Sequence, residues 1–358
     1  MLKSSQLENH DMKIAVILAA HGEAETTRFM ENYRVTSQTL AHASQVMPIP
    51  RTLQKTIAVT SSIKKLIRSR TNPECSPHNQ ITRDQVEALQ HSLDASPSAE
   101  LFDFKVHAAF SAAPPYVEQV IERTRLCDGQ VIVSMSPIDN TLSCGQLCSC
   151  LAASRSPDEL GKVKVLSRFW SDERLYSIYG DYLFNNSYQH YRAQSAEKDQ
   201  SKLLLLLFHG TLVKDAKGDP PLFRTGREET MKFSERLQEV LQGDPRNPYG
   251  RIMTVYLNHN VGGEWTRPSF EEITAMLATE SSLTVDLFGC GYFADGNETI
   301  HRVEALLHSS SVRAARSIPC LNCTPAFTDY LATRVTDAAR QIMIWRCITK
   351  SCVIKLNG

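Results

Sequence analysis

The chain has 358 residues, and its 39 Lys and Arg residues balance its 39 Asp and Glu residues. This length allows two domains of ordinary size, and the charge balance excludes the strongly basic surface typical of nucleic-acid binders. No apolar run approaches the roughly 20 residues that a membrane-spanning helix needs. We therefore expect a cytoplasmic protein without a transmembrane segment, for which peripheral membrane contact stays open.

Strand-like and helical patterns alternate along the chain, which predicts parallel sheets covered by helices. In the first half, the predicted strands are residues 13–18, 104–109 and 130–135, and the predicted helices are residues 82–93 and 115–125. In the second half, the predicted strands are residues 203–208, 251–257 and 283–288, and the predicted helices are residues 230–241, 269–278 and 325–340.

A polar stretch at residues 192–202 lacks any periodicity and predicts a crossover between two domains. We expect an N-terminal domain over residues 1–195 and a C-terminal domain over residues 196–330. Residues 331–358 are expected to form a helical segment that packs back on the domains. The predicted fold class is α/β, with two similar halves that face each other across a cleft.

A histidine and a glycine follow a buried strand twice, at His21-Gly22 and at His209-Gly210. Open α/β sheets bind ligands at the carboxyl ends of their strands. Position alone leaves two interpretations open, ligand binding and a structural hydrogen bond, because a histidine after a strand also serves as a hydrogen-bonding residue.

A carboxylate follows the strand predicted at residues 283–288, within the segment that contains Glu298. Because His209 and Glu298 both come after strands, we expect them to meet above the sheet. A histidine and a carboxylate can accept protons as general bases, and they can bind a borderline divalent metal. A lone glutamate that opens a helix also interacts favourably with the helix dipole.

Three segments of the second half resemble, in order, the motifs of the ferrochelatase family, the enzymes that insert ferrous iron into a porphyrin. The matching residues are His209-Gly210, then Gly262, Trp265 and Pro268, then Gly291, Asp295, Glu298 and Thr299, and finally Pro319 with Leu321-Asn322. The first half adds weaker matches around Ser76-Pro77 and Ser136-Pro137. The resemblance extends over about residues 13–340.

The resemblance implies two Rossmann-like domains that hold a porphyrin between them. It also implies that Fe(II) is inserted as a substrate into protoporphyrin IX or coproporphyrin III in haem biosynthesis. His209 and Glu298 would be the catalytic and metal-binding pair that takes the pyrrole protons, and which of them is the base stays open. The residues expected to contact the porphyrin substrate and haem product are His21, Ser76, Ser136 and Trp265.

Several positions depart from the family motifs. His259-Asn260 replaces a Ser-Arg pair, so one cationic contact is missing, and Gly296 stands where histidine is common. His21 stands where coproporphyrin-type ferrochelatases have a tyrosine that contacts the product iron. These departures keep two alternatives open: a sirohydrochlorin-type cobalt or iron chelatase, and a non-catalytic haem- or tetrapyrrole-binding protein with His21 as an axial ligand.

Ten cysteines without an export signal indicate a reducing compartment. Some ferrochelatases hold a [2Fe–2S] cluster, for which Cys144, Cys347 and Cys352 are the candidate ligands here. A cluster needs four ligands, and the third C-terminal cysteine of the family pattern is absent, so Cys320 or Cys323 would have to replace it. Ordinary buried thiols are the alternative.

Overall fold

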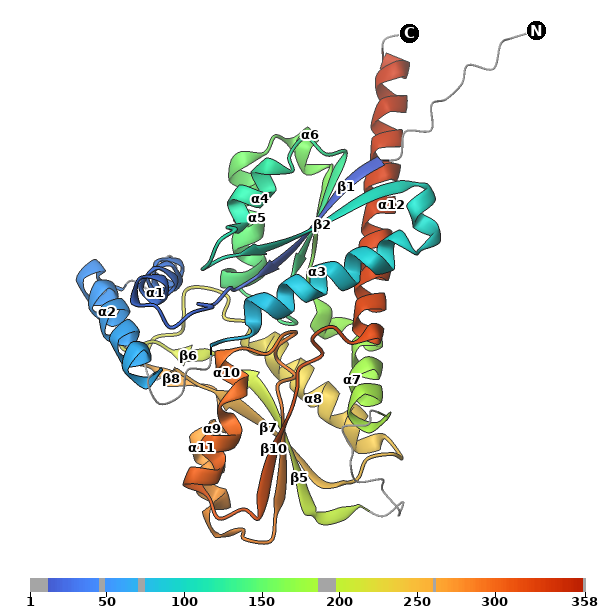
Figure 1. Ribbon diagram of the computed structural model, residues 1–358. Helices are drawn as coiled ribbons and strands as arrows, with labels where there is room; N and C mark the ends of the chain where they lie inside the picture. The colour runs from blue at the N-terminus through green and yellow to red at the C-terminus, as the bar shows by residue number, and fades with distance from the viewer. Residues whose placement is uncertain (1–11, 45–48, 70–74, 186–197, 260–261, 357–358) are drawn as a thin grey trace.

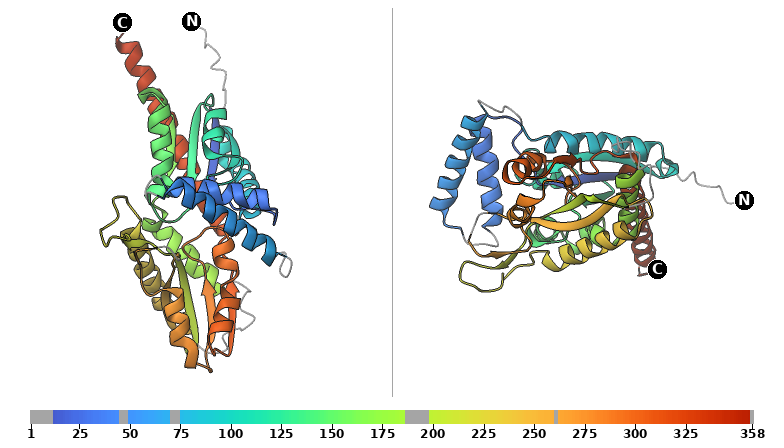
Figure 2. Two further views of the ribbon diagram at one scale, coloured as in Figure 1. Left: turned by 90° about the vertical axis from the view of Figure 1, so that its left-hand side faces the viewer. Right: turned by 90° about the horizontal axis from the view of Figure 1, so that it is seen from below.

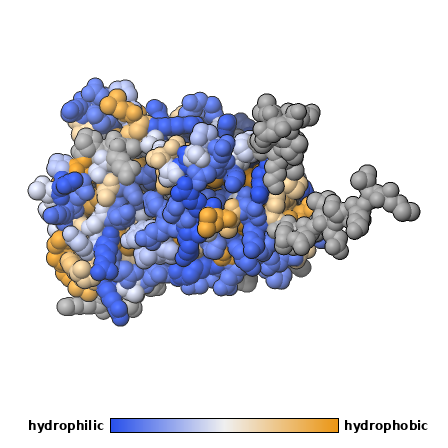
Figure 3. Space-filling view, turned by 90° about the horizontal axis from the view of Figure 1, so that it is seen from above, coloured by the Kyte–Doolittle hydropathy of each residue, from blue (hydrophilic) through white to orange (hydrophobic). Residues whose placement is uncertain are grey.

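The computed structural model describes residues 12–44, 49–69, 75–185, 198–259 and 262–356. Two four-stranded parallel sheets form its framework, one in the upper and one in the lower part of Figure 1. Among the described residues, no helix is long and apolar enough to cross a membrane. The surface seen from above is mainly hydrophilic, with apolar side chains in small separate groups (Figure 3).

The first sheet has the strand order β2-β1-β3-β4, with all neighbours parallel. Its strands are β1 (Met12–Ala20), β2 (Phe102–Phe110), β3 (Gly129–Ser134) and β4 (Val163–Leu166). The three strands predicted in this half are confirmed as β1, β2 and β3. The sequence did not predict β4, which has only four residues and is half-buried throughout.

The second sheet has the order β10-β9-β5-β7 and is also parallel. Its strands are β5 (Asp199–His209), β7 (Tyr249–Leu257), β9 (Thr284–Phe288) and β10 (Ala314–Ile318). The three predicted strands of this half are confirmed as β5, β7 and β9. A small antiparallel pair, β6 (Leu212–Lys214) and β8 (Glu264–Trp265), stands apart from the sheet.

Helices cover both sheets (Figures 1 and 2). Those of the first half are α1 (Phe29–Ala43), α2 (Arg51–Arg68), α3 (His78–Asp94), α4 (Val117–Arg123), α5 (Gln146–Ser154), α6 (Pro157–Leu160) and α7 (Glu173–Asn185). Those of the second half are α8 (Arg227–Gly243), α9 (Phe270–Met276), α10 (Asn297–Ile300), α11 (Arg302–Ser309) and α12 (Pro325–Leu356). Together with the two parallel sheets, they confirm the predicted α/β fold class.

The last helix, α12, returns to the first sheet. It packs against β3, β4, α3 and α7, and the side chain of Ile342 lies where a Cβ on Gly129 would meet it at 3.1 Å. The helix predicted at residues 325–340 is longer in the structure and continues to Leu356. The domain boundary expected at residue 330 falls inside α12, and the one at residues 195 and 196 lies outside the described residues.

Hydrogen bonds across the two halves fix their relative position. The Gln85 side chain donates from Nε2 to the carbonyl oxygens of Phe293 and Asn322, both at 3.0 Å. From α7, the Tyr179 hydroxyl donates to the carbonyl of Cys290 at 2.9 Å. One apolar core, with members such as Leu18 from the first half and Phe208 from the second, runs continuously through both halves. The loops at the carboxyl ends of both sheets therefore have defined positions.

Candidate metal centre

His209 is the last residue of β5, at the carboxyl end of the second sheet. Its Nδ1 lies 2.7 Å from the Gly210 carbonyl oxygen. Because a carbonyl oxygen only accepts hydrogen bonds, Nδ1 carries the proton, and in the neutral ring Nε2 keeps a free lone pair. The turn requires glycine at position 210, since a Cβ there would lie 2.9 Å from both the Asn258 Cα and the Leu257 carbonyl oxygen.

Two further side chains meet His209 at this point. His259 follows β7 by two residues, and its Nε2 lies 3.0 Å from the Nε2 of His209. Glu298 lies in α10, and its Oε1 is 3.8 Å from the Nε2 of His209 and 3.9 Å from that of His259. Within the described part of the chain, these three residues are the only group with the spacing of a metal site. We call them the His-His-Glu group.

Glu298 is held in its ionised form. The Tyr292 hydroxyl donates to its Oε2 at 2.5 Å. Burial by itself raises the pKa of this carboxyl, but the two neighbouring histidines and the Tyr292 hydrogen bond outweigh burial and hold the pKa below its ordinary value. Oε1 therefore faces the histidines as a charged acceptor.

His259 lies beside a tryptophan, and its pKa is lowered. Desolvation lowers the pKa of His259, and the neighbouring His209 lowers it further. The Trp265 ring of β8 packs edge-on against it, with centroids 5.5 Å apart at an interplanar angle of 75°. Trp265, expected to contact substrate, thus lies next to the His-His-Glu group.

His21 lies directly after β1 of the first sheet, opposite the His-His-Glu group. The ring of His21 is partly exposed, but the surrounding protein desolvates it enough to lower its pKa. The same ring interacts electrostatically with Glu298 and His209. Its Nε2 lies 3.5 Å from the Thr39 Oγ1. The carboxyl ends of the two sheets thus face each other here, where the sequence predicts a cleft.

Glu23 connects the two halves beside this point. Its Oε2 accepts a hydrogen bond from the backbone N–H of Asn297 at 3.0 Å. Asn79 holds the Glu23 backbone through bonds of 2.8 and 2.7 Å. A Cβ on Gly296 would lie 3.0 Å from Glu23 Oε1, so the carboxylate lies in the space that a larger residue at position 296 would need.

The two serines expected to contact substrate bond to their own turns. Ser76 is buried, and its Oγ accepts from the backbone N–H of His78 at 3.2 Å, at the start of α3. Ser136 Oγ donates to the Ile138 carbonyl at 3.1 Å. Neither belongs to the His-His-Glu group, and their contact with substrate stays a prediction.

The described cysteines form no cluster site. Cys144 is half-buried, its Sγ lies 3.6 Å from Asp139 Oδ1, and burial raises the pKa of its thiol. Burial also raises the pKa of Cys320 well above its ordinary value, and its Sγ donates to the Gly289 carbonyl. No cysteine belongs to a possible metal-binding group among the described residues. The side chains of Cys347 and Cys352 lie outside the described part of the chain.

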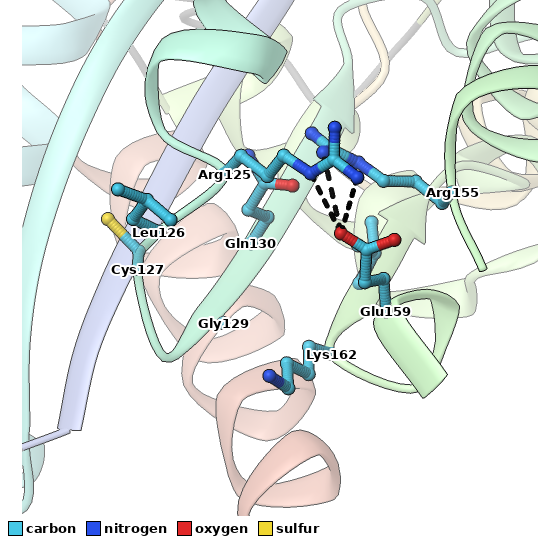
Figure 4. Close-up of a pocket in the computed structure, with 9 residues that line it drawn as sticks. Arg125, Leu126, Cys127, Gly129, Gln130, Arg155, Glu159 and Lys162 are labelled. Carbon is cyan, nitrogen blue, oxygen red and sulfur yellow. Dashed lines mark hydrogen bonds and ion pairs between the residues drawn. The ribbon is translucent and has the colours of Figure 1, made fainter. Parts of the chain in front are cut away.

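A separate pocket lies at the amino-terminal end of β3, away from the His-His-Glu group. Figure 4 shows the Arg125 and Arg155 side chains turned toward Glu159. Arg125 bonds to that carboxylate at 2.7 Å, and Arg155 lies 4.0 Å from it. The two guanidinium groups thus share Glu159 as an internal counter-ion. Parallel α/β sheets bind ligands at the carboxyl ends of their strands, which is the opposite end of this sheet from the pocket.

Sequence reasoning missed two residues of the site. His259 was noted only as the loss of a cationic contact, although it lies two residues beyond β7, at the same end of the sheet as His209. Tyr292 stood in a matching motif without a role, six residues before the carboxylate that it contacts. The signal for His259 was its position at the carboxyl end of a predicted strand.

The facing sheets and the His-His-Glu group between them define an α/β protein of two parallel sheets with a candidate site for a divalent metal. Comparison with known families is consistent with this class. The family model described as Ferrochelatase matches residues 13–339, and the chain belongs to the ferrochelatase family.

Individual relatives are more distant. Ferrochelatase from Marinobacter nauticus is 29% identical over 187 residues, which are 50% of this chain and 48% of that protein. Ferrochelatase from Neisseria gonorrhoeae is 26% identical over 190 residues, 51% of this chain and 50% of that protein. The aligned part of the chain thus spans about half the length of these curated relatives. The solved structure titled SirB from Bacillus subtilis with Fe3+ covers 92% of this chain and 96% of its own, with a TM-score of 0.49 and 10% identity.

Proposed function

We propose that this protein inserts Fe(II), taken up as a substrate, into a porphyrin, either protoporphyrin IX or coproporphyrin III. The observation that carries the proposal is the His-His-Glu group, in which two imidazole nitrogens and an ionised carboxylate converge between the two sheets. Imidazole and carboxylate together suit iron and other borderline divalent metals. Membership of the ferrochelatase family supports the same reaction.

The reaction requires bases and a metal ligand at one place, because a porphyrin loses two pyrrole protons as the metal enters. His209 Nε2 offers a lone pair, since the Gly210 carbonyl holds the ring proton at Nδ1. Glu298 offers the charged Oε1, since Tyr292 occupies Oε2. We assign proton transfer and metal delivery to His209 and Glu298 as a coupled pair rather than to either alone.

The porphyrin would lie between the two sheets, with His209 on one face and His21 on the other. Electrostatic interaction of His21 with both Glu298 and His209 supports this placement. Trp265, next to His259, would form part of the wall. Ser76 and Ser136 would contact the porphyrin from the loops of the first sheet, where each also bonds to its own turn. We place the reaction in the cytoplasm on account of the ten cysteines.

The test is an anaerobic assay of the purified protein with Fe(II) and, separately, protoporphyrin IX, coproporphyrin III and sirohydrochlorin. We expect the absorption bands of the metallated porphyrin with wild type and their loss with His209→Ala. Porphyrin binding without metallation would contradict the proposal and favour a tetrapyrrole carrier with His21 as axial ligand. Metallation of sirohydrochlorin alone would favour the sirohydrochlorin-type chelatase. The spectrum of the protein as purified reports on a [2Fe–2S] cluster at the same time.

A further inference from the structure

We infer that the protein holds the metal before insertion with three of its own side chains, and that His259 is the third ligand beside His209 and Glu298. The inference rests on the proposed function and deepens it, because the family resemblance implies only a histidine–glutamate pair. It assigns metal binding to His259, which in the sequence indicated only the loss of a cationic contact.

The spacing of the three ligand atoms fits one metal ion. A first-row divalent metal binds nitrogen and oxygen at about 2.1 Å, so its ligand atoms are about 3.0 Å apart at right angles and about 3.4 Å apart in a tetrahedron. The two Nε2 atoms are 3.0 Å apart. Glu298 Oε1 is 3.8 and 3.9 Å from them, so a shift of about 0.4–0.9 Å brings it into range.

Outer contacts orient each of the three side chains. The Gly210 carbonyl fixes the tautomer of His209, Tyr292 fixes the Glu298 carboxylate, and Trp265 packs against the edge of His259. Hydrogen bonds like those of His209 and Glu298 accompany most protein metal ligands and raise the affinity for the metal. Three side chains that met by chance would not each be expected to have an orienting contact.

All three ligands lie at the carboxyl end of the second sheet, in β5, after β7 and in α10, so they approach the metal from one side. Two histidines and one carboxylate on one face leave the remaining coordination positions open. Those positions face His21 and the first sheet, where the proposed function places the porphyrin nitrogens. The donor set favours Fe(II), Co(II) or Zn(II) over Mg(II) and Ca(II), which prefer oxygen ligands.

A competing explanation is a simple hydrogen bond in which the N–H of His259 donates to His209. In that case His259 orients His209 and does not touch the metal. The two explanations differ in the number of imidazoles bound to a metal ion.

The experiment uses Co(II) as the probe, added without oxygen to the full-length protein in the absence of any tetrapyrrole. Visible absorption gives the affinity, and paramagnetically shifted proton NMR counts the metal-bound imidazole N–H groups. We expect two such groups in wild type and one in His259→Ala, with affinity for Co(II) at least tenfold lower. His308→Ala, at an exposed histidine of α11, is the matched control and should behave as wild type.

The outcomes separate this inference from the proposed function. Two imidazole signals in the His259→Ala protein, or unchanged Co(II) affinity, would overturn the third ligand and leave metal insertion standing if Fe(II) is still inserted. Wild-type protein that binds Co(II) through two imidazoles but metallates no tetrapyrrole would overturn the proposed function and leave the three-ligand site standing. Thermal melting of each variant shows whether it is folded.

Discussion

The carboxyl ends of the two sheets begin with the same short motif and differ in what surrounds it. His21-Gly22 follows β1 and His209-Gly210 follows β5, each at a central strand of a parallel sheet. His209 faces a second imidazole and a carboxylate, whereas His21 belongs to no metal-like group of the described residues. The motif marks the carboxyl end of a sheet, where ligands bind, but it does not decide the chemistry.

The neighbouring strands explain the difference. β5 lies between β9 and β7, and the segments after those strands carry Glu298, in α10, and His259. β1 lies between β2 and β3, and no donor from the segments after those strands joins His21 in a metal-like group of the described residues. A histidine at a strand end becomes part of a metal centre when the adjacent strands deliver further donors.

The largest expected effect is on catalysis by His209. Replacing His209 with alanine removes the nitrogen proposed to accept a proton, and general-base catalysis contributes roughly 10²–10⁴-fold in rate. We expect His209→Ala to lower the rate of Fe(II) insertion by at least about 10²-fold. The same replacement at His21 should cost about tenfold or less, because His21 is proposed to contact substrate and does not belong to the His-His-Glu group. Equal losses in both variants would contradict the comparison.

Tyr292→Phe should have the next largest effect. It removes the hydrogen bond to Glu298, and loss of such outer contacts lowers metal affinity or activity by about 10–100-fold. The matched control is Tyr249→Phe, because the Tyr249 hydroxyl also bonds to a carboxylate, Asp286, at 2.6 Å. Tyr249 opens β7 at the far end of the same sheet, so its replacement should lower stability and spare activity. A similar loss of activity in both variants would argue against a specific role for Tyr292.

The glycine of the first motif, Gly22, is expected to affect stability. Gly22 has a φ of +84°, and a Cβ there would lie 2.6 Å from Phe110 Cβ. We expect Gly22→Ala to lower the free energy of unfolding by about 1–3 kcal/mol, measured by urea denaturation. Gly243→Ala is the control, since a Cβ there meets nothing within 4 Å at the end of α8. Equal stability of the two variants would show that the first turn is not constrained as described.

The smallest effect concerns the attachment of α12. Burial by itself raises the pKa of Asp172, but hydrogen bonds from Arg174 and Tyr330 outweigh burial and hold the pKa well below its ordinary value. Its folded pKa is therefore below the unfolded value of about 3.9. The stabilisation is present above that value and is lost as the pH falls below it.

Asp172→Asn tests this attachment. We expect it to lower the free energy of unfolding by about 1 kcal/mol at neutral pH, because solvent screens part of the interaction. Near pH 3 the loss should be smaller, because the stabilisation by the carboxylate is itself partly lost there. Thermal melting over this pH range, with the exposed Asp158→Asn as control, measures the difference. A loss that does not change with pH would contradict the account.

Much of the framework could be predicted from sequence because buried strands such as residues 203–208 leave an unmistakable apolar run. The pair His209 and Glu298 followed from motif order. Helices α1 and α2 left a weaker signal, because α2 buries only Ala58 and Ser62 and keeps several apolar residues exposed. His259 could not be placed beside His209 without knowing that β5 and β7 are neighbours, and strand order is a property of the whole fold.

The central claim is that the metal binds at the carboxyl end of the second sheet. Crystals of the protein soaked in Co(II) and measured at the cobalt absorption edge test it most directly, because anomalous scattering locates the metal without reference to any activity. We expect one strong peak about 2.1 Å from the ligand nitrogens of His209 and His259, with Glu298 Oε1 drawn toward it. A peak at His21, or no peak at the His-His-Glu group, would contradict the account.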